Sequence, residues 1–283
     1  MKTTILRLSV SIVLFEQDMA VFRQALASLF EAVENYKGRN SHFVVHVFIV
    51  DNNCTSSIND EVTGWLSDCN NLHCNVEVIF GHGNVGYGSG HNMAIRNSAR
   101  LGYTYHLIMN SDVILDRDAL RVSLEYMEKN SEVSAVSPFA LDGVGNKQYL
   151  CKKYPTLCDL FLRGFGPPWL KRRFDVRLSE YERRDLSELE PTKGISIISG
   201  CFMLCRRKVL EDLGGFDESF FLYFEDFDLS LRASVRGPLA YLPSMKIQHF
   251  GGGAARKGLR HSMYFFVSGV KFFNKHRWAW ARR

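Results

Sequence analysis

The chain has 283 residues, a formal net charge of +5 and 46% hydrophobic residues. This composition is typical of a globular protein, with enough length for one large α/β domain or two small ones. No uninterrupted apolar run reaches the roughly 20 residues that cross a bilayer. The first residues, Met1–Arg7, lead into a strand rather than a signal peptide. We therefore expect a cytoplasmic protein whose membrane association, if any, is peripheral.

Basic residues gather in two stretches, Leu162–Arg173 and Lys271–Arg283, with aromatic residues between them. Such stretches suit an anionic membrane surface or an anionic lipid-linked substrate, although a solvated basic face has the same pattern. No nucleic-acid-binding motif accompanies them, so we expect no nucleic-acid partner. The seven cysteines are irregularly spaced and match no zinc-ribbon pattern. We expect them to be reduced.

Strands and helices alternate through residues 1–130. An amphipathic helix is predicted at Met19–Tyr36 and another up to Arg100, and apolar strands are predicted at Leu8–Phe15, Phe43–Val50, Val76–Phe80 and Tyr103–Met109. This alternation indicates a parallel sheet with right-handed crossovers. Ligands of such sheets bind beyond the carboxyl ends of the strands. Asp51, Asp112 and the glycine-rich segment Gly81–Asn92 are expected at that edge.

The second half of the chain is less regular. Strands are predicted at Val133–Val136, Ile195–Leu204 and Leu239–His249, and a last helix at about His261–Lys275. Gly200 interrupts the middle strand, which indicates a bulge or a close approach of the backbone to a ligand. The segment Tyr154–Pro191 is rich in charge, proline and aromatic residues. Its composition and length are typical of a mobile, functional insertion.

The stretch Gly214–Leu229 combines acidic and aromatic side chains. A helix opening at Glu225 places Phe224, Phe227, Leu231 and Val235 on one stripe, with Asp226 roughly opposite. Asp226 is therefore expected to face a cleft. A helix N-terminus favours its ionised form, and aromatic walls raise its pKa, a balance that suits a general base. The alternative is that these acidic residues only cap and solvate helix starts.

Two further groups have candidate chemistry. Gly86, Gly88 and Gly90 lack the spacing of a dinucleotide fingerprint, but glycine lets the backbone close against a nucleotide, and Asn84 and Asn92 offer polar groups. The alternative is a flexible loop. Asp112, after a strand, suits a hard cation such as Mg²⁺ or Mn²⁺, and His249, also at a strand end, can supply an imidazole to the same ion. Taken singly, each is more often a structural residue.

In chain order, these motifs together resemble the GT-A glycosyltransferases of family two. The resemblance depends on the first strand, Asp51–Asn53, Asn84–Asn92, Asn110–Asp112, Ser199–Arg207, Gly214–Arg232 and His249–Gly253. It covers the chain from Leu8 to about His276. Within the family, the chain looks most similar to bacterial rhamnosyltransferases that build O-antigen, lipopolysaccharide core or cell-wall glycans.

The resemblance implies a GT-A fold, an α/β mostly parallel sheet flanked by helices, with a C-terminal acceptor-binding part. It implies that Asp226 is the catalytic base beside Glu225, and that Asp112 and His249 bind Mg²⁺ or Mn²⁺. Asn110 replaces the first aspartate of the family's DxD motif, which leaves one carboxylate for the metal. The implied nucleotide pocket is Phe15, Asp51, Asn84, Gly86, Gly90, Asn92, Asn110 and Ser111. The segment implied to close over the donor diphosphate contributes Arg256, Lys257, Arg260 and Tyr264.

The implied activity is inverting, metal-assisted transfer of a hexose, L-rhamnose from dTDP-rhamnose, to a hydroxyl of a bacterial surface glycan or lipid-linked acceptor. Transfer of galactose, glucose or galactofuranose from a UDP donor fits the same motifs. A non-catalytic nucleotide-binding scaffold fits less well, because Asp226, Asp112 and His249 are all present. An NAD-linked oxidoreductase is disfavoured, because Phe15–Asp18 lacks glycine. A position on the inner face of the bacterial inner membrane and a homodimer are compatible with the sequence.

We accordingly divide the chain into three parts. Residues 1–130 form the nucleotide-sugar-binding half. Residues 131–260 form the acceptor-binding and catalytic half of the same domain, in which the Tyr154–Pro191 insertion is expected to bind the acceptor. Residues 261–283 form a C-terminal amphipathic helix and a basic aromatic tail.

Overall fold

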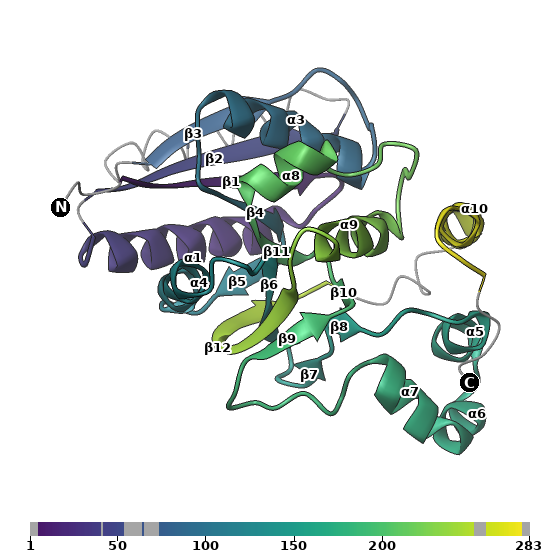
Figure 1. The fold of residues 1–283 in the computed structure, drawn as a ribbon. Coiled ribbons are helices and arrows are strands. Elements are labelled where there is room, and N and C mark those ends of the chain that lie inside the picture. Colours follow the sequence, from purple (N-terminus) through teal and green to yellow (C-terminus); the bar gives the residue numbers. More distant parts are fainter. Residues whose placement is uncertain (1–4, 41, 54–63, 65–73, 252–258, 279–283) are drawn as a thin grey trace.

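The computed structural model describes residues 5–40, 42–53, 64, 74–251 and 259–278. Its N-terminal strands are parallel and neighbour one another in the order β3-β2-β1-β4. Helix α1 (Met19–Lys37) and helix α3 (Tyr87–Arg100) cover opposite faces of them (Figure 1). These strands are β1 (Leu6–Leu14), β2 (Phe43–Asp51), β3 (Cys74–Ile79) and β4 (Tyr105–Asn110). The predicted α/β architecture is confirmed.

Beyond β4 the sheet becomes mixed, because β11 runs antiparallel to both β4 and β6. Strand β12 is parallel to β6, and β5 is antiparallel to β12. The pairing of β12 with β6 shifts register between Leu242 and Lys246. These strands are β5 (Val113–Leu115), β6 (Ala135–Leu141), β7 (Lys147–Gln148, paired with β6), β9 (Thr192–Ile195, paired with β12), β11 (Phe202–Arg206) and β12 (Leu239–His249).

The continuous strand predicted at Ile195–Leu204 is divided in the structure. Its middle part, β10 (Ile197–Ile198), leaves the main sheet and pairs with β8 (Cys151–Lys152). The chain then rejoins the main sheet as β11 after Gly200. The interruption predicted at Gly200 is therefore present, and it separates two strands rather than bulging one.

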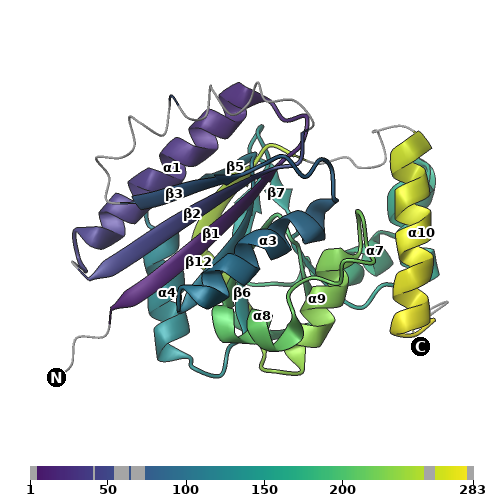
Figure 2. The ribbon, with the colours of Figure 1, turned by 90° about the horizontal axis from the view of Figure 1, so that it is seen from above.

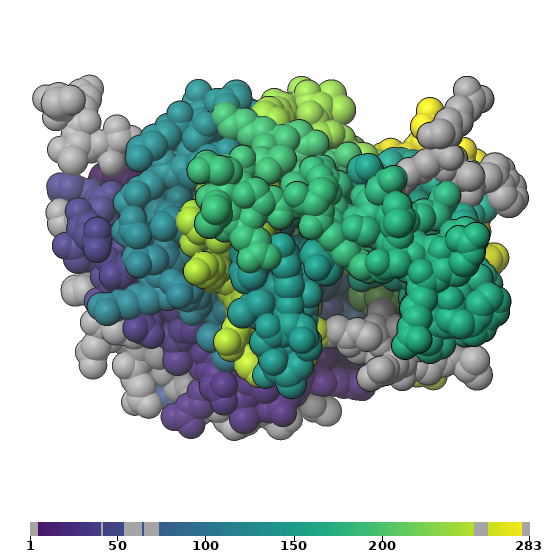
Figure 3. All heavy atoms as spheres, turned by 90° about the horizontal axis from the view of Figure 1, so that it is seen from below, coloured from purple at the N-terminus to yellow at the C-terminus, as the bar shows by residue number. Residues whose placement is uncertain are grey.

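The helices of the Tyr154–Pro191 segment lie at one end of the molecule (Figure 1). They are α5 (Leu157–Phe165), α6 (Pro168–Arg173) and α7 (Asp175–Tyr181), and Figure 3 shows them as a teal-green lobe at one side. Helix α10 (Leu259–Lys275) lies beside α5 at this end (Figures 1 and 2). The remaining helices are α4 (Ala119–Lys129), α8 (Arg207–Leu213) and α9 (Glu225–Ser234).

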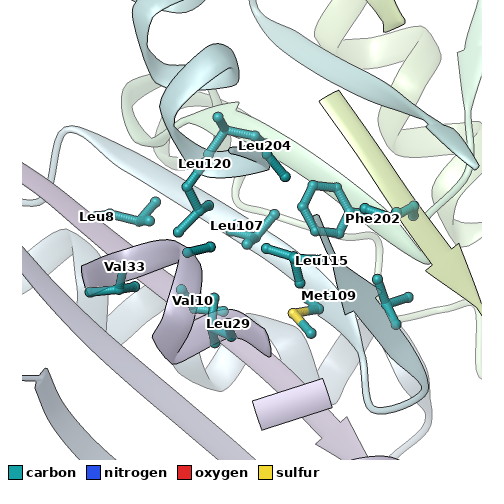
Figure 4. Packing of buried hydrophobic residues seen from close by; sticks show 14 of the residues in the cluster. Leu8, Val10, Leu29, Val33, Leu107, Met109, Leu115, Leu120, Phe202 and Leu204 are labelled. Atoms are coloured by element: carbon teal, nitrogen blue, oxygen red, sulfur yellow. The ribbon is translucent and has the colours of Figure 1, made fainter. Parts of the chain in front are cut away.

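The main core lies between the sheet and helices α1 and α4. Leu8 and Val10 of β1 and Leu107 of β4 pack against Leu29 of α1 and Leu120 of α4 (Figure 4). Each fully buried leucine contributes about 2 kcal/mol relative to an exposed one. Strands that are buried on both faces need an almost continuous run of apolar residues. Such runs are visible in the sequence, and the strands could therefore be predicted from it.

A second, aromatic cluster joins the C-terminal helix to the rest of the chain. Phe272 and Phe273 of α10 are buried with Leu160 of α5 and Phe224 beside α9. These two phenylalanines of the basic stretch Lys271–Arg283 therefore belong to the interior. Val235, expected on the buried stripe of α9, is 84% exposed, because the helix ends at Ser234.

A buried carboxylate reinforces the same junction. Asp228 of α9 is fully buried and accepts hydrogen bonds from Arg232 Nε (2.7 Å) and His276 Nε2 (2.8 Å). The ammonium of Lys275 lies 2.7 Å from the same carboxylate. These contacts tie the end of α10 to α9. No helix within the described residues combines the length and apolar character required to span a bilayer.

Candidate active site

Asp226 lies in the first turn of α9, next to the break between β10 and β11. The backbone N–H of Gly200 donates to Asp226 Oδ2 (3.0 Å), and that of Phe227 donates to Oδ1 (2.9 Å). A Cβ on Gly200 would lie 3.1 Å from Asp226 Cβ and 3.3 Å from Tyr87 Cε1. Gly200 is therefore needed for a close approach of the backbone to a functional side chain.

Backbone strain precedes this turn. Tyr223 and Phe224 have φ angles of 70° and 66°, in the left-handed region that residues other than glycine seldom adopt. Phe224 is the N-cap residue of α9, and its ring is buried in the aromatic cluster. Strained backbone of this kind concentrates at functional sites, where packing around it maintains the conformation. Here the packed ring of Phe224 holds the turn from which Glu225 and Asp226 project.

Glu225 and Asp226 differ in their surroundings. Burial raises the pKa of Asp226, while the N–H donors of Gly200 and Phe227 and the positive charge of Arg163 oppose this effect. Burial and the neighbouring charge of Asp226 raise the pKa of Glu225 well above its usual value. Within the described residues, Glu225 Oε2 has no hydrogen-bond partner. Glu225 therefore keeps its proton more readily, and Asp226 is the carboxylate of the pair.

Asp112 and His249 are brought together by the antiparallel pairing of β5 and β12. Asp112 Oδ1 lies 3.4 Å from His249 Nε2, and the Phe250 N–H donates to the Asp112 carbonyl (3.0 Å). A Cβ on Gly251 would lie 2.3 Å from Asp112 Oδ2 and 2.8 Å from His249 Nε2. The missing side chain at Gly251 leaves room beside both groups, and a carboxylate with an imidazole fits Mg²⁺ or Mn²⁺.

Gln148 fixes the orientation of His249 through a contact that no sequence pattern indicates. Its Nε2 donates to the His249 carbonyl (2.9 Å), so its Oε1 faces His249 Nδ1 at 2.8 Å. Because a carbonyl oxygen only accepts, His249 Nδ1 carries the proton and Nε2 keeps a lone pair toward Asp112. Such outer partners commonly orient metal-binding histidines. Gln148 lies in a two-residue strand, which has no sequence periodicity.

No group of three or more histidine, cysteine, aspartate or glutamate side chains that could hold a metal occurs among the described residues. Asp112 and His249 would therefore leave the other coordination positions to water or to a phosphate-containing ligand, as is common for Mg²⁺. Asn110 adjoins them, with its Nδ2 3.4 Å from His249 Nε2. The Tyr87 hydroxyl lies within hydrogen-bonding distance of Asn110 Oδ1 (2.9 Å) and the Gly200 carbonyl (2.7 Å). Tyr87 thus links the Asp112–His249 pair to the backbone beside Asp226.

The expected nucleotide-binding residues lie at the carboxyl ends of β1, β2 and β4. Asp51 is buried and accepts from the backbone and side-chain N–H groups of Asn53 (2.9 and 2.8 Å). Asn84 accepts from the Gly86 N–H (3.0 Å). Phe15, just after β1, is 47% exposed, and Ser111 is partly exposed in the turn before β5.

Gly86 and Asn52 shape the glycine-rich segment. Gly86 has φ 90°, and a Cβ there would lie 2.3 Å from the Phe221 carbonyl oxygen. Asn52, which the sequence analysis did not single out, donates to the Gly86 carbonyl (3.0 Å). Helix α3 begins at Tyr87, earlier than predicted, so this segment is a short turn followed directly by a helix.

Gly90 and Asn92 lie behind this turn rather than at its surface. Asn92 is 1% exposed, and it donates to the Phe216 carbonyl (2.9 Å) and accepts from the Phe216 N–H (2.8 Å). A Cβ on Gly90 would lie 2.9 Å from Val13 Cγ2. The structure therefore places Asn92 as a brace of the Gly214–Phe216 turn, not as a group open to a nucleotide.

The residues expected to close over the diphosphate are only partly described. Arg256 and Lys257 lie outside the described residues, whereas Arg260 and Tyr264 lie in the first turns of α10. The ring of Tyr264 lies 4.9 Å from that of Phe221, whose carbonyl accepts from the Tyr87 N–H (3.0 Å). The beginning of α10 is thus connected to the glycine-rich turn through Phe221.

The fold is the GT-A fold of glycosyltransferases, a mixed α/β sheet flanked by helices. The model of the family described as "Glycosyltransferase like family 2" matches residues 17–278. The chain belongs to this family.

Two curated relatives are named rhamnosyltransferases. The chain is 28% identical to rhamnosyltransferase WbbL of Escherichia coli K12 over 176 residues, which cover 58% of this chain and 61% of the relative. It is 26% identical to the N-acetylglucosaminyl-diphospho-decaprenol L-rhamnosyltransferase of Mycobacterium tuberculosis over 189 residues, or 62% of this chain and 59% of the relative. The matched part is therefore about three fifths of the length of these relatives.

Solved structures support the fold. GalNAc-T7 with UDP, GalNAc and Mn²⁺ aligns with a TM-score of 0.64 and 12% identity, covering 96% of this chain and 48% of that one. The mannosyltransferase PcManGT of Pyrobaculum calidifontis with GDP-Man and Mn²⁺ aligns with a TM-score of 0.58 and 16% identity, covering 95% of this chain and 65% of that one. Divalent metal ions thus accompany glycosyltransferases of this fold.

Proposed function

We propose that the protein transfers L-rhamnose from dTDP-rhamnose to a hydroxyl of a bacterial surface glycan or lipid-linked acceptor, with inversion at the anomeric carbon. The observation that carries this proposal is the Glu225–Asp226 pair. Asp226 accepts from two backbone N–H groups, and burial together with the charge of Asp226 raises the pKa of the adjoining Glu225. The choice of rhamnose is supported by the names of the curated relatives.

In the proposed reaction, Asp226 takes the proton of the acceptor hydroxyl. The hydroxyl oxygen then forms a bond to the anomeric carbon from the face opposite the diphosphate. The bond between that carbon and the diphosphate oxygen breaks, and the diphosphate leaves with its electrons. Protonated Glu225 can donate a hydrogen bond to an acceptor oxygen and keep the sugar in line.

Asp112 and His249 would hold a Mg²⁺ or Mn²⁺ ion that neutralises the charge developing on the leaving diphosphate. Gln148 Oε1, which faces His249 Nδ1, would orient the imidazole so that Nε2 faces the ion. Asp51, Asn84, Phe15 and the Gly86 turn would surround the nucleoside. Arg260 and Tyr264, together with Arg256 and Lys257, are proposed to close over the diphosphate.

Positive charge beside Asp226 supports an anionic acceptor. Arg163 of α5 is close enough for its charge to lower the pKa of Asp226. Arg163 also pairs with Glu182 (3.2 Å). A diphosphate on a lipid carrier, as named for the mycobacterial relative, matches this charge. We therefore also propose a peripheral place on the inner face of a bacterial inner membrane.

A UDP-sugar donor is the second candidate. The same residues would bind it, and the structure of GalNAc-T7, which has a similar fold, contains UDP. The test is donor hydrolysis without acceptor, measured across dTDP-rhamnose, UDP-galactose, UDP-glucose and UDP-galactofuranose with Mg²⁺, Mn²⁺ or EDTA. Release of dTDP from dTDP-rhamnose alone, abolished by EDTA, is expected. Selective hydrolysis of a UDP-sugar would show that this sugar, and not dTDP-rhamnose, is the donor. Binding of nucleotide with neither hydrolysis of any donor nor transfer to any acceptor would indicate a scaffold.

A further inference from the structure

Helices α5 and α10 lie side by side at one end of the molecule (Figures 1 and 2). Their facing sides are joined by the aromatic cluster, in which Leu160 packs with Phe272 and Phe273. The ring of Tyr154, just before α5, lies 5.6 Å from that of Phe272. These contacts fix the two helices to each other and to α9, so their remaining faces form one end of a single packed body.

The remaining faces of these helices expose large apolar side chains. On α5, Phe161 and Phe165 are 55% and 61% exposed and lie one turn apart. On α10, Met263, Phe266 and Val267 are exposed at the spacing of one helical stripe. Trp169 of α6, which follows Phe165 by four residues in the chain, is 68% exposed. Apolar groups gathered in this way indicate an interaction surface.

The charges on the same helices have one sign. Between residues 157 and 173 and between residues 259 and 275, the only acidic residue is Asp159. Asp159 is fully buried and accepts from Arg177 Nε (2.7 Å). The last turn of α6 carries Lys171, Arg172 and Arg173, for which no ion pair occurs within the described residues. The surface is therefore apolar and basic, which matches anionic lipid headgroups over an acyl interior.

We propose that the exposed faces of α5, α6 and α10 dock the protein on an anionic bilayer. We call this the docking face; its residues are Phe161, Phe165, Trp169, Lys171, Arg172, Arg173, Met263, Phe266 and Val267. The aromatic and aliphatic side chains enter the headgroup region, and the basic side chains contact lipid phosphates. A second copy of the chain is the poorer partner, because two basic faces would repel each other.

Helix α5, which carries Phe161 and Phe165 of the docking face, also carries Arg163, whose positive charge lowers the pKa of Asp226. An acceptor anchored in the bilayer would therefore present its sugar to Asp226 without leaving the membrane. This inference deepens the proposed function, and its purpose rests on that function. Lipid binding itself does not depend on the donor, so the two can fail separately.

The test is sedimentation of the full chain with vesicles of phosphatidylcholine alone or mixed with phosphatidylglycerol. We expect binding to the mixed vesicles that weakens with salt. The double variants Phe165→Ser/Trp169→Ser and Arg172→Glu/Arg173→Glu should each bind about tenfold more weakly or worse. The matched controls Val235→Ser and Arg236→Glu change exposed residues at the end of α9 and should bind as wild type. Unchanged melting temperatures would show that all variants fold.

Equal binding of the docking-face variants and the wild type would overturn the proposal, as would indifference to phosphatidylglycerol. A dimer of the wild type that dissociates in Phe165→Ser/Trp169→Ser, without vesicle binding, would assign the face to a second copy instead. Donor hydrolysis should be the same in all these variants. Absence of donor hydrolysis with intact vesicle binding would reject the proposed transfer and leave the docking face standing.

Discussion

The N–H of Gly200 donates a 3.0 Å hydrogen bond to Asp226 Oδ2, and this bond joins the break between β10 and β11 to the first turn of α9. With the N–H of Phe227, it gives Asp226 two donors that favour the ionised carboxylate. Glu225, one residue earlier, accepts no such bond at Oε2 within the described residues. Backbone geometry thus separates the roles of two adjacent acidic side chains.

Replacing Asp226 with asparagine should leave the fold intact, because the amide oxygen can still accept a backbone hydrogen bond. The acceptor hydroxyl would lose its base, so transfer should fall by about 10²-fold to 10⁴-fold. Transfer rates and melting curves of the variant would be compared with those of Asp212→Asn, an exposed change on α8. Transfer by Asp226→Asn at the wild-type rate would remove Asp226 as the base.

Glu225→Gln should stabilise the protein at neutral pH. Burial raises the pKa of Glu225 above its usual 4.5, so the folded state binds this proton more tightly than the unfolded state. The stability due to neutral Glu225 is fully present below pH 4.5 and is lost as the pH rises through the raised pKa. The gain in melting temperature should therefore shrink as the pH approaches 4.5. A gain that grows toward acid pH would contradict a raised pKa.

Gln148→Ala should weaken Mn²⁺ binding by about 10-fold to 100-fold, because His249 would lose the partner that fixes its Nδ1 proton. Titration followed by electron paramagnetic resonance would measure the affinity, and nitrogen chemical shifts would report the tautomer of His249. Gln248→Ala, an exposed change beside His249, is the matched control. Equal affinity in the two variants would show that Gln148 does not orient the ligand.

Gly251→Ala should abolish metal binding without removing a ligand. Its Cβ would lie 2.3 Å from Asp112 Oδ2 and 2.8 Å from His249 Nε2, in the space that an ion would share with them. Calorimetric titration with Mn²⁺ would check this, with Gly164→Ala as the control, since nothing lies within 4 Å of a Cβ there. Normal Mn²⁺ affinity in Gly251→Ala would place the ion elsewhere.

Acid should destabilise the fold through two core histidines. His106 bonds Ser9 (2.7 Å) and Ser11 (2.9 Å), and Ser11 bonds His91 (2.6 Å). Burial lowers the pKa of His106 from 6.5 to about 3 and that of His91 well below 6.5. The unfolded state therefore binds more protons below pH 6.5, and the free energy of unfolding should fall by about 1.4 kcal/mol per pH unit for each histidine. Urea unfolding at several pH values would measure this slope. The slope should decrease in His106→Gln and not in His42→Asn.

The sequence predicted the elements whose residues follow a simple pattern. The parallel strands are almost continuously apolar, and β12 was predicted with the bounds Leu239–His249 that the structure gives it. Gly200 was expected to mark a close approach, and it contacts Asp226. Asp112 and His249 were expected in one site, and β5–β12 pairing brings them to 3.4 Å.

Other features depend on contacts that no local pattern records. Gln148 reaches His249 from a strand of two residues, too short to show periodicity. Phe272 and Phe273 lie in the basic stretch Lys271–Arg283, yet they are buried. Their partner Leu160 lies more than a hundred residues earlier, so no local pattern shows this contact. Asn92 looked like a free polar group, but its amide is engaged by Phe216. Each of these outcomes was decided by tertiary packing rather than by the neighbouring residues in the chain.

The register shift in β12 divides this strand into two segments with separate alignment. Leu239–Leu242 pair with β6, and Leu239–Tyr241 also pair with β9. Ile247 and Gln248 pair with β6 on one side, and Ile247, Gln248 and His249 pair with Leu115, Ile114 and Val113 of β5 on the other. Asp112 directly precedes β5, so the same three residue pairs position both proposed metal ligands. The spacing between these ligands is therefore set within one small hairpin-like unit.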